Sequence, residues 1–183
     1  METIEFQNLT MIISIIIGVG FTKLLTSLSD VLRTNEIKVE PLYLMWVVIM
    51  FILNIEFIWN LRLQTKLSLS LLRAIIYLLG PISLFFMTDS LTVHDRIEND
   101  ISKLPNQMIF FVYGILYFAS QVLVAYLIKD EAFIHPQNLF RYAAIGLCLS
   151  GVWLRVYYFH LIIAAFSLLT LFSYIFMTDR LQF

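Results

Sequence analysis

The sequence has few charged residues and almost no cysteine. Only 14% of its 183 residues are charged, against about 25% in an ordinary soluble domain. The single cysteine, Cys148, excludes an intramolecular disulfide and a thiolate cluster. With 12 basic residues against 13 acidic ones, there is no basic surplus to attract phosphate, which argues against a nucleic-acid partner.

Signatures of catalysis are also missing. The three histidines, His94, His135 and His160, lie far apart in the sequence, and no pair has the spacing of metal ligands. There is no G-x-S-x-G elbow and no glycine loop of the kind that binds phosphate. We therefore expect no enzyme activity, no metal site and no cofactor.

Apolar residues are abundant instead. They make up 60% of the chain, and the mean hydropathy is +0.85. A water-soluble globule of this size could not bury so much apolar surface. The composition predicts an integral membrane protein whose first partner is the lipid bilayer.

Six apolar segments are long enough to cross a hydrocarbon core of about 30 Å at 1.5 Å per residue. The prediction is an all-α integral membrane protein with six transmembrane helices in one domain, residues 1–183. The last two segments are separated only by Tyr158, Phe159 and His160, which predicts a tight hairpin or one bent helix pair. The segments comprise residues 11–30, 42–61, 70–88, 108–128, 139–157 and 161–178.

The N-terminus is acidic and lacks the basic region of a signal peptide, so we expect the first segment to remain in the mature protein. Basic residues near the segment ends are almost balanced between the two sides. The side that holds both termini has six, and we therefore predict cytoplasmic termini, with the reverse orientation left open. The six are Arg62, Lys66, Arg73, Lys129, Arg141 and Arg180; the opposite five are Arg33, Lys38, Arg96, Lys103 and Arg155.

A short motif occurs twice. Phe-Met-Thr-Asp closes the third segment at 86–89 and the sixth at 176–179. Two tandem units of three helices must have opposite orientations, as in the inverted repeats typical of transporters. The motif suggests two inverted three-helix halves, residues 1–91 and 106–183, although chance can produce such a match in so biased a composition.

The first segment carries a polar stripe. Thr22, Thr26 and Asp30 recur every four residues, and Lys23 lies beside them. Because a charge inside the bilayer costs about 2.5–3.5 kcal/mol, these residues are candidates for an ion or solute path. The alternative is a helix that reaches water near Thr26, with Lys23 extended toward the interface.

Glu56 is the acidic residue of the second segment. It lies at about the depth of Arg73 on the third segment, so an ion pair with Arg73, or alternatively with Arg62, is the structural interpretation. The functional alternative is a cation or proton site at Glu56. Gln121 in the fourth segment is a further candidate for the path, or a simple hydrogen bond between helices.

Two local features follow. Gly80 and Pro81 interrupt the third segment, which predicts a helix break that exposes carbonyl groups, or only a kink. Residues 92–105 have apolar side chains at helical spacing, among them Ile97 and Ile101. They predict an amphipathic helix in the membrane interface, or alternatively a docking surface for a protein partner.

A family resemblance covers the first two segments. The run Gly-Val-Gly-Phe-Thr-Lys-Leu-Leu-Thr at 18–26, followed by Pro-Leu-Tyr-Leu-Met-Trp at 41–46 and Glu-Phe-Ile-Trp at 56–59, resembles a group of small, uncharacterised bacterial multi-pass membrane proteins. The resemblance implies the bacterial inner membrane and no activity.

Two functions are open at this point. The first is a channel or carrier for a small ion or solute, formed as a homo-oligomer because six short spans leave little room for a cavity within one chain. The second is a non-transporting sensor or anchor subunit in a multi-component stress or phage-response system, in which segment 92–105 contacts the partner.

Overall fold

The computed structural model describes residues 2–33, 41–62, 70–92, 107–128, 132–154 and 157–181, and these form six helices and no strand. The prediction of an all-helical chain is confirmed. Segment 93–106, with Ile97 and Ile101, lies outside the described residues. The helices are α1 (Glu2–Arg33), α2 (Pro41–Arg62), α3 (Leu71–Leu91), α4 (Gln107–Leu127), α5 (Pro136–Trp153) and α6 (Tyr157–Leu181).

α3 continues through Gly80 and Pro81 without interruption, so the predicted helix break is wrong, and the alternative of a kink stays a prediction. Proline removes one backbone donor, but a neighbouring helix packed against that turn can hold it in helical geometry. Here α4 supplies the packing, because a Cβ on Gly80 would lie 2.8 Å from the Gln121 side chain and 3.3 Å from that of Ser120.

The boundary between α5 and α6 lies earlier than predicted. α5 ends at Trp153, and its C-cap Leu154 has an extended backbone. Tyr158, Phe159 and His160 therefore belong to the first turns of α6 and not to a linker. His160 is buried and its ring stacks on Phe111 at 5.4 Å, so contact with α4 holds the start of α6 within the bundle.

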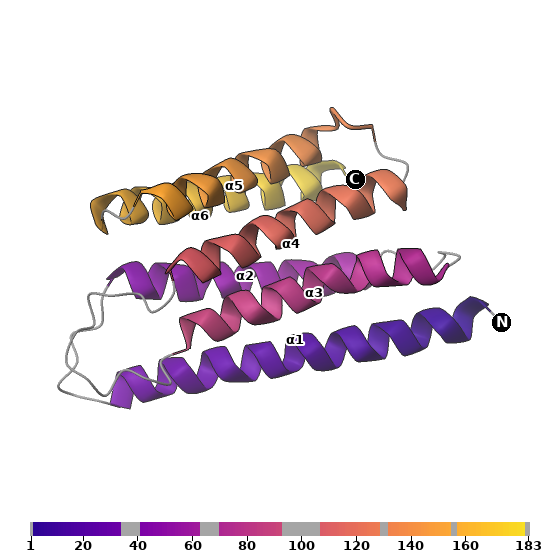
Figure 1. Cartoon of the computed structure of the whole chain (residues 1–183), viewed down its shortest axis with the longest axis horizontal. Coiled ribbons are helices and arrows are strands. Elements are labelled where there is room, and N and C mark those ends of the chain that lie inside the picture. The colour runs from indigo at the N-terminus through magenta and orange to yellow at the C-terminus, as the bar shows by residue number, and fades with distance from the viewer. Residues whose placement is uncertain are drawn as a thin grey trace.

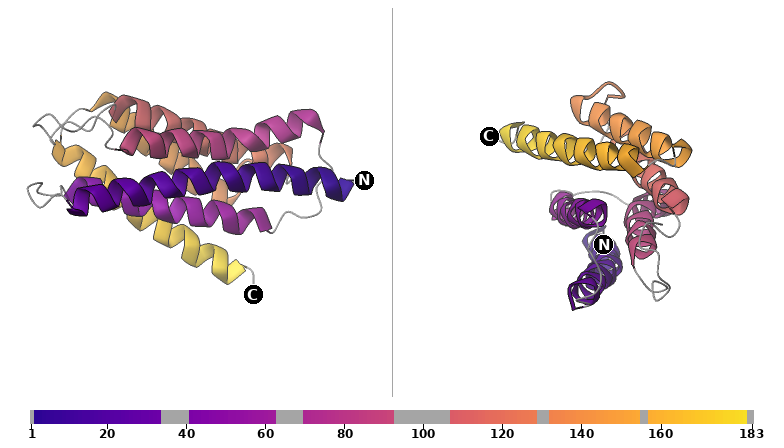
Figure 2. Two further views of the ribbon diagram at one scale, coloured as in Figure 1. Left: turned by 90° about the horizontal axis from the view of Figure 1, so that it is seen from below. Right: turned by 90° about the vertical axis from the view of Figure 1, so that its left-hand side faces the viewer.

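The six helices run up and down along one long axis (Figure 1). α3 packs against α1 on one side and α4 on the other, and α4 also packs against α5. α2 contacts α1, α3 and α6. In the end view of Figure 2, α6 crosses the others obliquely, and its C-terminal half points away from the bundle.

The two halves of the chain are packed differently. In the first half α1 packs closely against α3, whereas in the described parts of the second half α4 packs closely against α5 and meets α6 through side chains such as Phe111 and His160. This asymmetry gives the predicted inverted repeat no support from packing, and the repeat stays a prediction from the sequence.

Four of the helices are long and apolar enough to cross a membrane: Gln7–Asp30, Pro41–Asn60, Leu71–Leu91 and Met108–Leu127. α6 contributes a shorter apolar stretch, Tyr158–Ser173. Large apolar side chains also face outward, including Met11 at 65% exposed, Leu72 at 67% and Ile162 at 63%. Soluble monomers rarely expose apolar patches of this extent.

Candidate functional site

A cavity of about 70 Å³ lies inside the bundle, with walls from α2, α3, α4, α5 and α6. Roughly 10–15 Å³ of such volume holds one water molecule, so the space accommodates several waters or a small solute. Its polar lining consists of Glu56, Tyr117, Gln121, Arg141, Ser167 and Thr170; its apolar lining includes Trp46, Ile49, Met87, Cys148, Ile163 and Leu171.

The polar lining gathers toward one end of the bundle because neighbouring helices run in opposite directions. Glu56 and Gln121 lie in the second halves of α2 and α4, and Arg141 lies in the first half of α5, which runs the other way. Trp46 and Cys148 occupy the opposite halves of α2 and α5. The cavity therefore has a polar end and an apolar end, and the polar end is on the side of the N-terminus (Figure 1).

Glu56 is half-buried at the polar end, and neighbouring donors hold its carboxylate. The Asn60 side-chain amide donates to Oε1, and the Tyr117 hydroxyl lies 3.5 Å from Oε2. These contacts orient the Glu56 carboxylate at the cavity wall.

Arg141 brings the opposite charge. Its side chain is buried, at 8% exposed, and Nη1 donates to Oδ1 of Asn138 at 2.6 Å. Asn138 is itself buried and donates to the carbonyl of Ala132 at 3.1 Å. A chain of hydrogen bonds from the start of α5 therefore fixes the guanidinium where it lines the cavity.

Gln121, like Glu56, is a predicted path residue that lies in the cavity wall. It reaches this position because the facing residue is Gly80: a Cβ there would lie 2.8 Å from Nε2 of Gln121 and 3.1 Å from Phe57. The absent side chain at Gly80 lets α3 and α4 approach closely.

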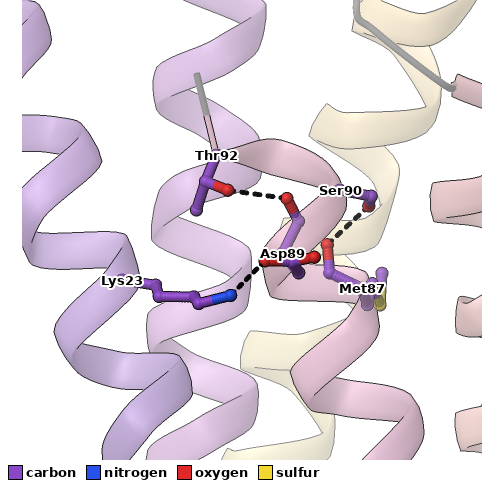
Figure 3. Close-up of polar contacts among 5 residues, drawn as sticks. All are labelled: Lys23, Met87, Asp89, Ser90 and Thr92. Atoms are coloured by element: carbon purple, nitrogen blue, oxygen red, sulfur yellow. Dashed lines mark hydrogen bonds and ion pairs between the residues drawn. The ribbon is translucent and has the colours of Figure 1, made fainter. Parts of the chain in front are cut away.

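Lys23 lies elsewhere. Its ammonium group forms an ion pair with Asp89 at the end of α3 (Figure 3) and lies 4.8 Å from the centre of the Phe85 ring. The hydroxyl of Thr92 donates to the Asp89 carbonyl at 2.7 Å, closing the last turn of α3. Lys23 therefore ties α1 to α3 and is not part of the cavity wall.

The rest of the polar stripe lies on the outer face of α1. Thr22, Thr26 and Asp30 are exposed. The hydroxyl of Thr22 donates to the carbonyl of Gly18 at 2.9 Å, and that of Thr26 to the carbonyl of Thr22 at 3.0 Å. Within one chain these residues line no described cavity, so a path along them would require a second molecule.

Arg73, the predicted partner of Glu56, is half-buried on the first turn of α3. Glu56 contacts Asn60 and Tyr117, among other residues. The pairing of Glu56 with Arg73 stays a prediction.

Sequence reasoning missed Arg141 as a site residue and counted it among the basic residues at the membrane surface. The available signal was its spacing: Asn138 and Arg141 are three residues apart, which places both on one face of a helix, and Cys148 seven residues later continues that face. A buried polar face on α5 could have been inferred from these positions.

Comparisons with protein-family models, with curated proteins and with solved structures found no match to this chain.

Proposed function

We propose that this protein is a small multi-pass membrane protein that moves a small ion or polar solute across the bilayer, with the cavity as its binding site. The observation that carries the proposal is the cavity itself, which has charged side chains at one end and lies inside a bundle whose outer surface is apolar. Charged groups in membrane-embedded helices are costly and mark substrate pathways, and transporter sites lie at the junction of packed helices.

Six membrane spans are part of this proposal. α5 is not among the helices that are apolar enough to span a membrane by composition alone, because it carries Gln137, Asn138 and Arg141. Two of these, Asn138 and Arg141, are buried in the bundle, so α5 does not need to expose them to lipid. We place the helices in the bacterial inner membrane, with cytoplasmic termini.

A cavity within one chain changes the role of the proposed homo-oligomer. The sequence suggested that six short spans leave little room for a cavity within one chain. A cavity of about 70 Å³ nevertheless lies between the helices of one protomer. We infer that each protomer has its own site and that association covers the polar outer face of α1. The non-transporting alternative depended on residues 92–105, nearly all of which lie outside the described part of the chain.

The test is flux into liposomes that contain the purified protein, read out for protons, potassium, chloride and radiolabelled glycine. Loss of a hydrogen bond to a charged group is worth about 1.5–3 kcal/mol, so Glu56→Gln and Arg141→Gln should each reduce flux by about tenfold or more. Lys23→Met, outside the cavity wall, is the matched control and should keep flux within about twofold.

Two outcomes would count against the proposal. Equal flux in wild-type protein and both cavity variants would mean that the cavity is not part of the transport path. Absence of flux for every species, with the protein folded and inserted, would contradict transport and favour the sensor or anchor.

A further inference from the structure

Two sulfur atoms from different helices lie close together at the apolar end of the cavity. Cys148 on α5 and Met87 on α3 both line the cavity, and Cys148 is a free thiol. A Cβ on Gly114 of α4 would lie 2.9 Å from Sγ of Cys148 and 3.8 Å from Sδ of Met87. The two sulfurs therefore approach the same point, where α4 has no side chain.

We propose that this sulfur pair binds a soft monovalent metal ion, Cu(I) or Ag(I). The inference rests on the proposed function, because it names the class of ion that the cavity takes. Thiolate and thioether ligands select Cu(I), whereas hard cations such as magnesium and calcium prefer oxygen ligands. Among the described residues, no group of three or more His, Cys, Asp or Glu side chains could hold a metal ion, which disfavours Zn(II) with its four ligands.

The position of the two sulfurs suits an ion with few ligands. A bond between a metal and sulfur is about 2.3 Å long, so two sulfurs that share one ion lie at most about 4.6 Å apart. Methionine has three rotatable bonds and adapts to irregular spaces, so Met87 can close on an ion bound to Cys148. Both side chains are buried, and few water molecules therefore compete for the ion.

Binding at this site is a ligand exchange without a redox step. The Cys148 thiol loses its proton to solvent, a metal–sulfur bond forms, and the ion keeps its single positive charge. The thiolate and the ion together are neutral, and a neutral pair costs far less to bury than an isolated charge. The apolar end of the cavity is therefore suited to a monovalent ion.

A buried imidazole lies on the same side of the bundle. His160 of α6 is 1% exposed, and neither ring nitrogen has a hydrogen-bond partner of normal geometry within the described helices, although the backbone of Leu154 approaches the ring. His160 precedes Ile163 by three residues, so both lie on one face of α6, and Ile163 lines the cavity. Imidazole is a ligand for copper, and a metal-bound histidine often donates its other ring nitrogen to a backbone carbonyl. His160 is thus a third donor for the ion.

The test measures binding of Cu(I), kept reduced under argon, to the purified protein in competition with a chromogenic Cu(I) chelator. We expect one ion per chain. Cys148→Ser should abolish binding. Met87→Leu and His160→Phe, which keeps a ring to stack on Phe111, should each weaken it by about tenfold or more, because even indirect partners of metal ligands contribute about 10–100-fold to affinity. Met50→Leu is the matched control, since Met50 is buried outside the cavity wall, and it should bind within about twofold of wild type.

Trp46 reports where the ion is bound, because it lines the cavity and is 3% exposed, whereas Trp59 and Trp153 are 57% and 84% exposed. In a Trp59→Phe/Trp153→Phe background, Trp46 is the one remaining tryptophan. Ag(I), a heavy ion that is not readily oxidised, should quench its fluorescence saturably. Met87→Leu in this background should shift the titration to an Ag(I) concentration about tenfold higher.

Three outcomes would overturn the inference. The first is absence of Cu(I) binding to the folded protein. The second is binding that is lost with Cys148→Ser but unchanged in both Met87→Leu and His160→Phe, since a lone thiol would then take the ion. The third is equal weakening by Met50→Leu and Met87→Leu, which would mean a general disturbance of packing.

The inference and the proposed function can fail separately. Cu(I) binding without flux of any ion, including Ag(I), would refute transport alone. Flux of protons, potassium or chloride without Cu(I) binding would refute this inference alone.

Discussion

At the interface of α1 and α3, Lys23 forms an ion pair with Asp89 in the last turns of α3. Around the cavity, Glu56 accepts from Asn60 and Tyr117, Arg141 donates to Asn138, and both side chains line an open volume. The same residue types thus serve two purposes. The Lys23–Asp89 pair joins two helices, whereas the hydrogen bonds that Glu56 accepts from Asn60 and that Arg141 donates to Asn138 position the two charged groups at the cavity wall.

The largest expected effect comes from filling the cavity. Ala144 lines it from α5, whereas Ala143 is exposed on the outer face of the same helix. Ala144→Leu places three more carbon atoms in the space at an overpacking cost of about 1–3 kcal/mol, so flux should fall by about tenfold or more.

Ala143→Leu is the matched control for this change and should leave flux within about twofold. The flux of the two variants is compared in liposomes. Equal behaviour of the two variants would mean that the cavity is not a binding site.

A smaller effect on flux should follow from a substitution at Gly80 that displaces the neighbouring Gln121 side chain. In Gly80→Ala the new Cβ would lie 2.8 Å from Nε2 of Gln121, so the amide must shift within the cavity wall. We expect flux to change by about two- to fivefold, as for the loss of one neutral hydrogen bond of about 0.5–1 kcal/mol.

Gly18→Ala provides the contrast, since nothing lies within 4 Å of a Cβ at that position. It should leave flux unchanged and raise the free energy of unfolding by about 0.5–1 kcal/mol through helix propensity. Flux that responds to Gly18→Ala as strongly as to Gly80→Ala would contradict the assignment of Gln121.

The smallest effect concerns the ion pair. Lys23 and Asp89 are 40% and 43% exposed, and exposed pairs contribute about 0.2–1 kcal/mol. A double-mutant cycle with Lys23→Met and Asp89→Asn should give a coupling energy in this range from the unfolding transition, with flux within about twofold of wild type. If Lys23→Met reduced flux as much as Glu56→Gln does, Lys23 would have to be part of the transport path.

The helices themselves were largely predictable. Continuous apolar runs located six helical segments, because a helix buried on most sides needs apolar residues on most sides. The errors fell at Gly80–Pro81 and at 158–160, where local signals suggested interruptions. In the structure, packing of α4 against Gly80 and stacking of His160 on Phe111 hold these residues in helices.

The candidate site was less predictable. Glu56 and Gln121 were singled out because polar groups inside apolar segments are costly, and both line the cavity. Lys23 was singled out for the same reason and lies in an ion pair instead, while Arg141 was missed because it lies near the start of its segment. The free-energy cost of placing a polar group inside an apolar segment identifies residues that need a partner. It does not say whether that partner is a neighbouring side chain or a ligand.

Composition and periodicity alone determined an all-helical chain with a mostly apolar surface, because these properties depend on each residue and its near neighbours. Tertiary structure alone decided that Lys23 meets Asp89, that Arg141 turns inward beside Asn138, and that a cavity remains between the helices. Those outcomes depend on how each helix is rotated about its axis and which helix it faces. Both are set by the joint packing of residues far apart in the sequence.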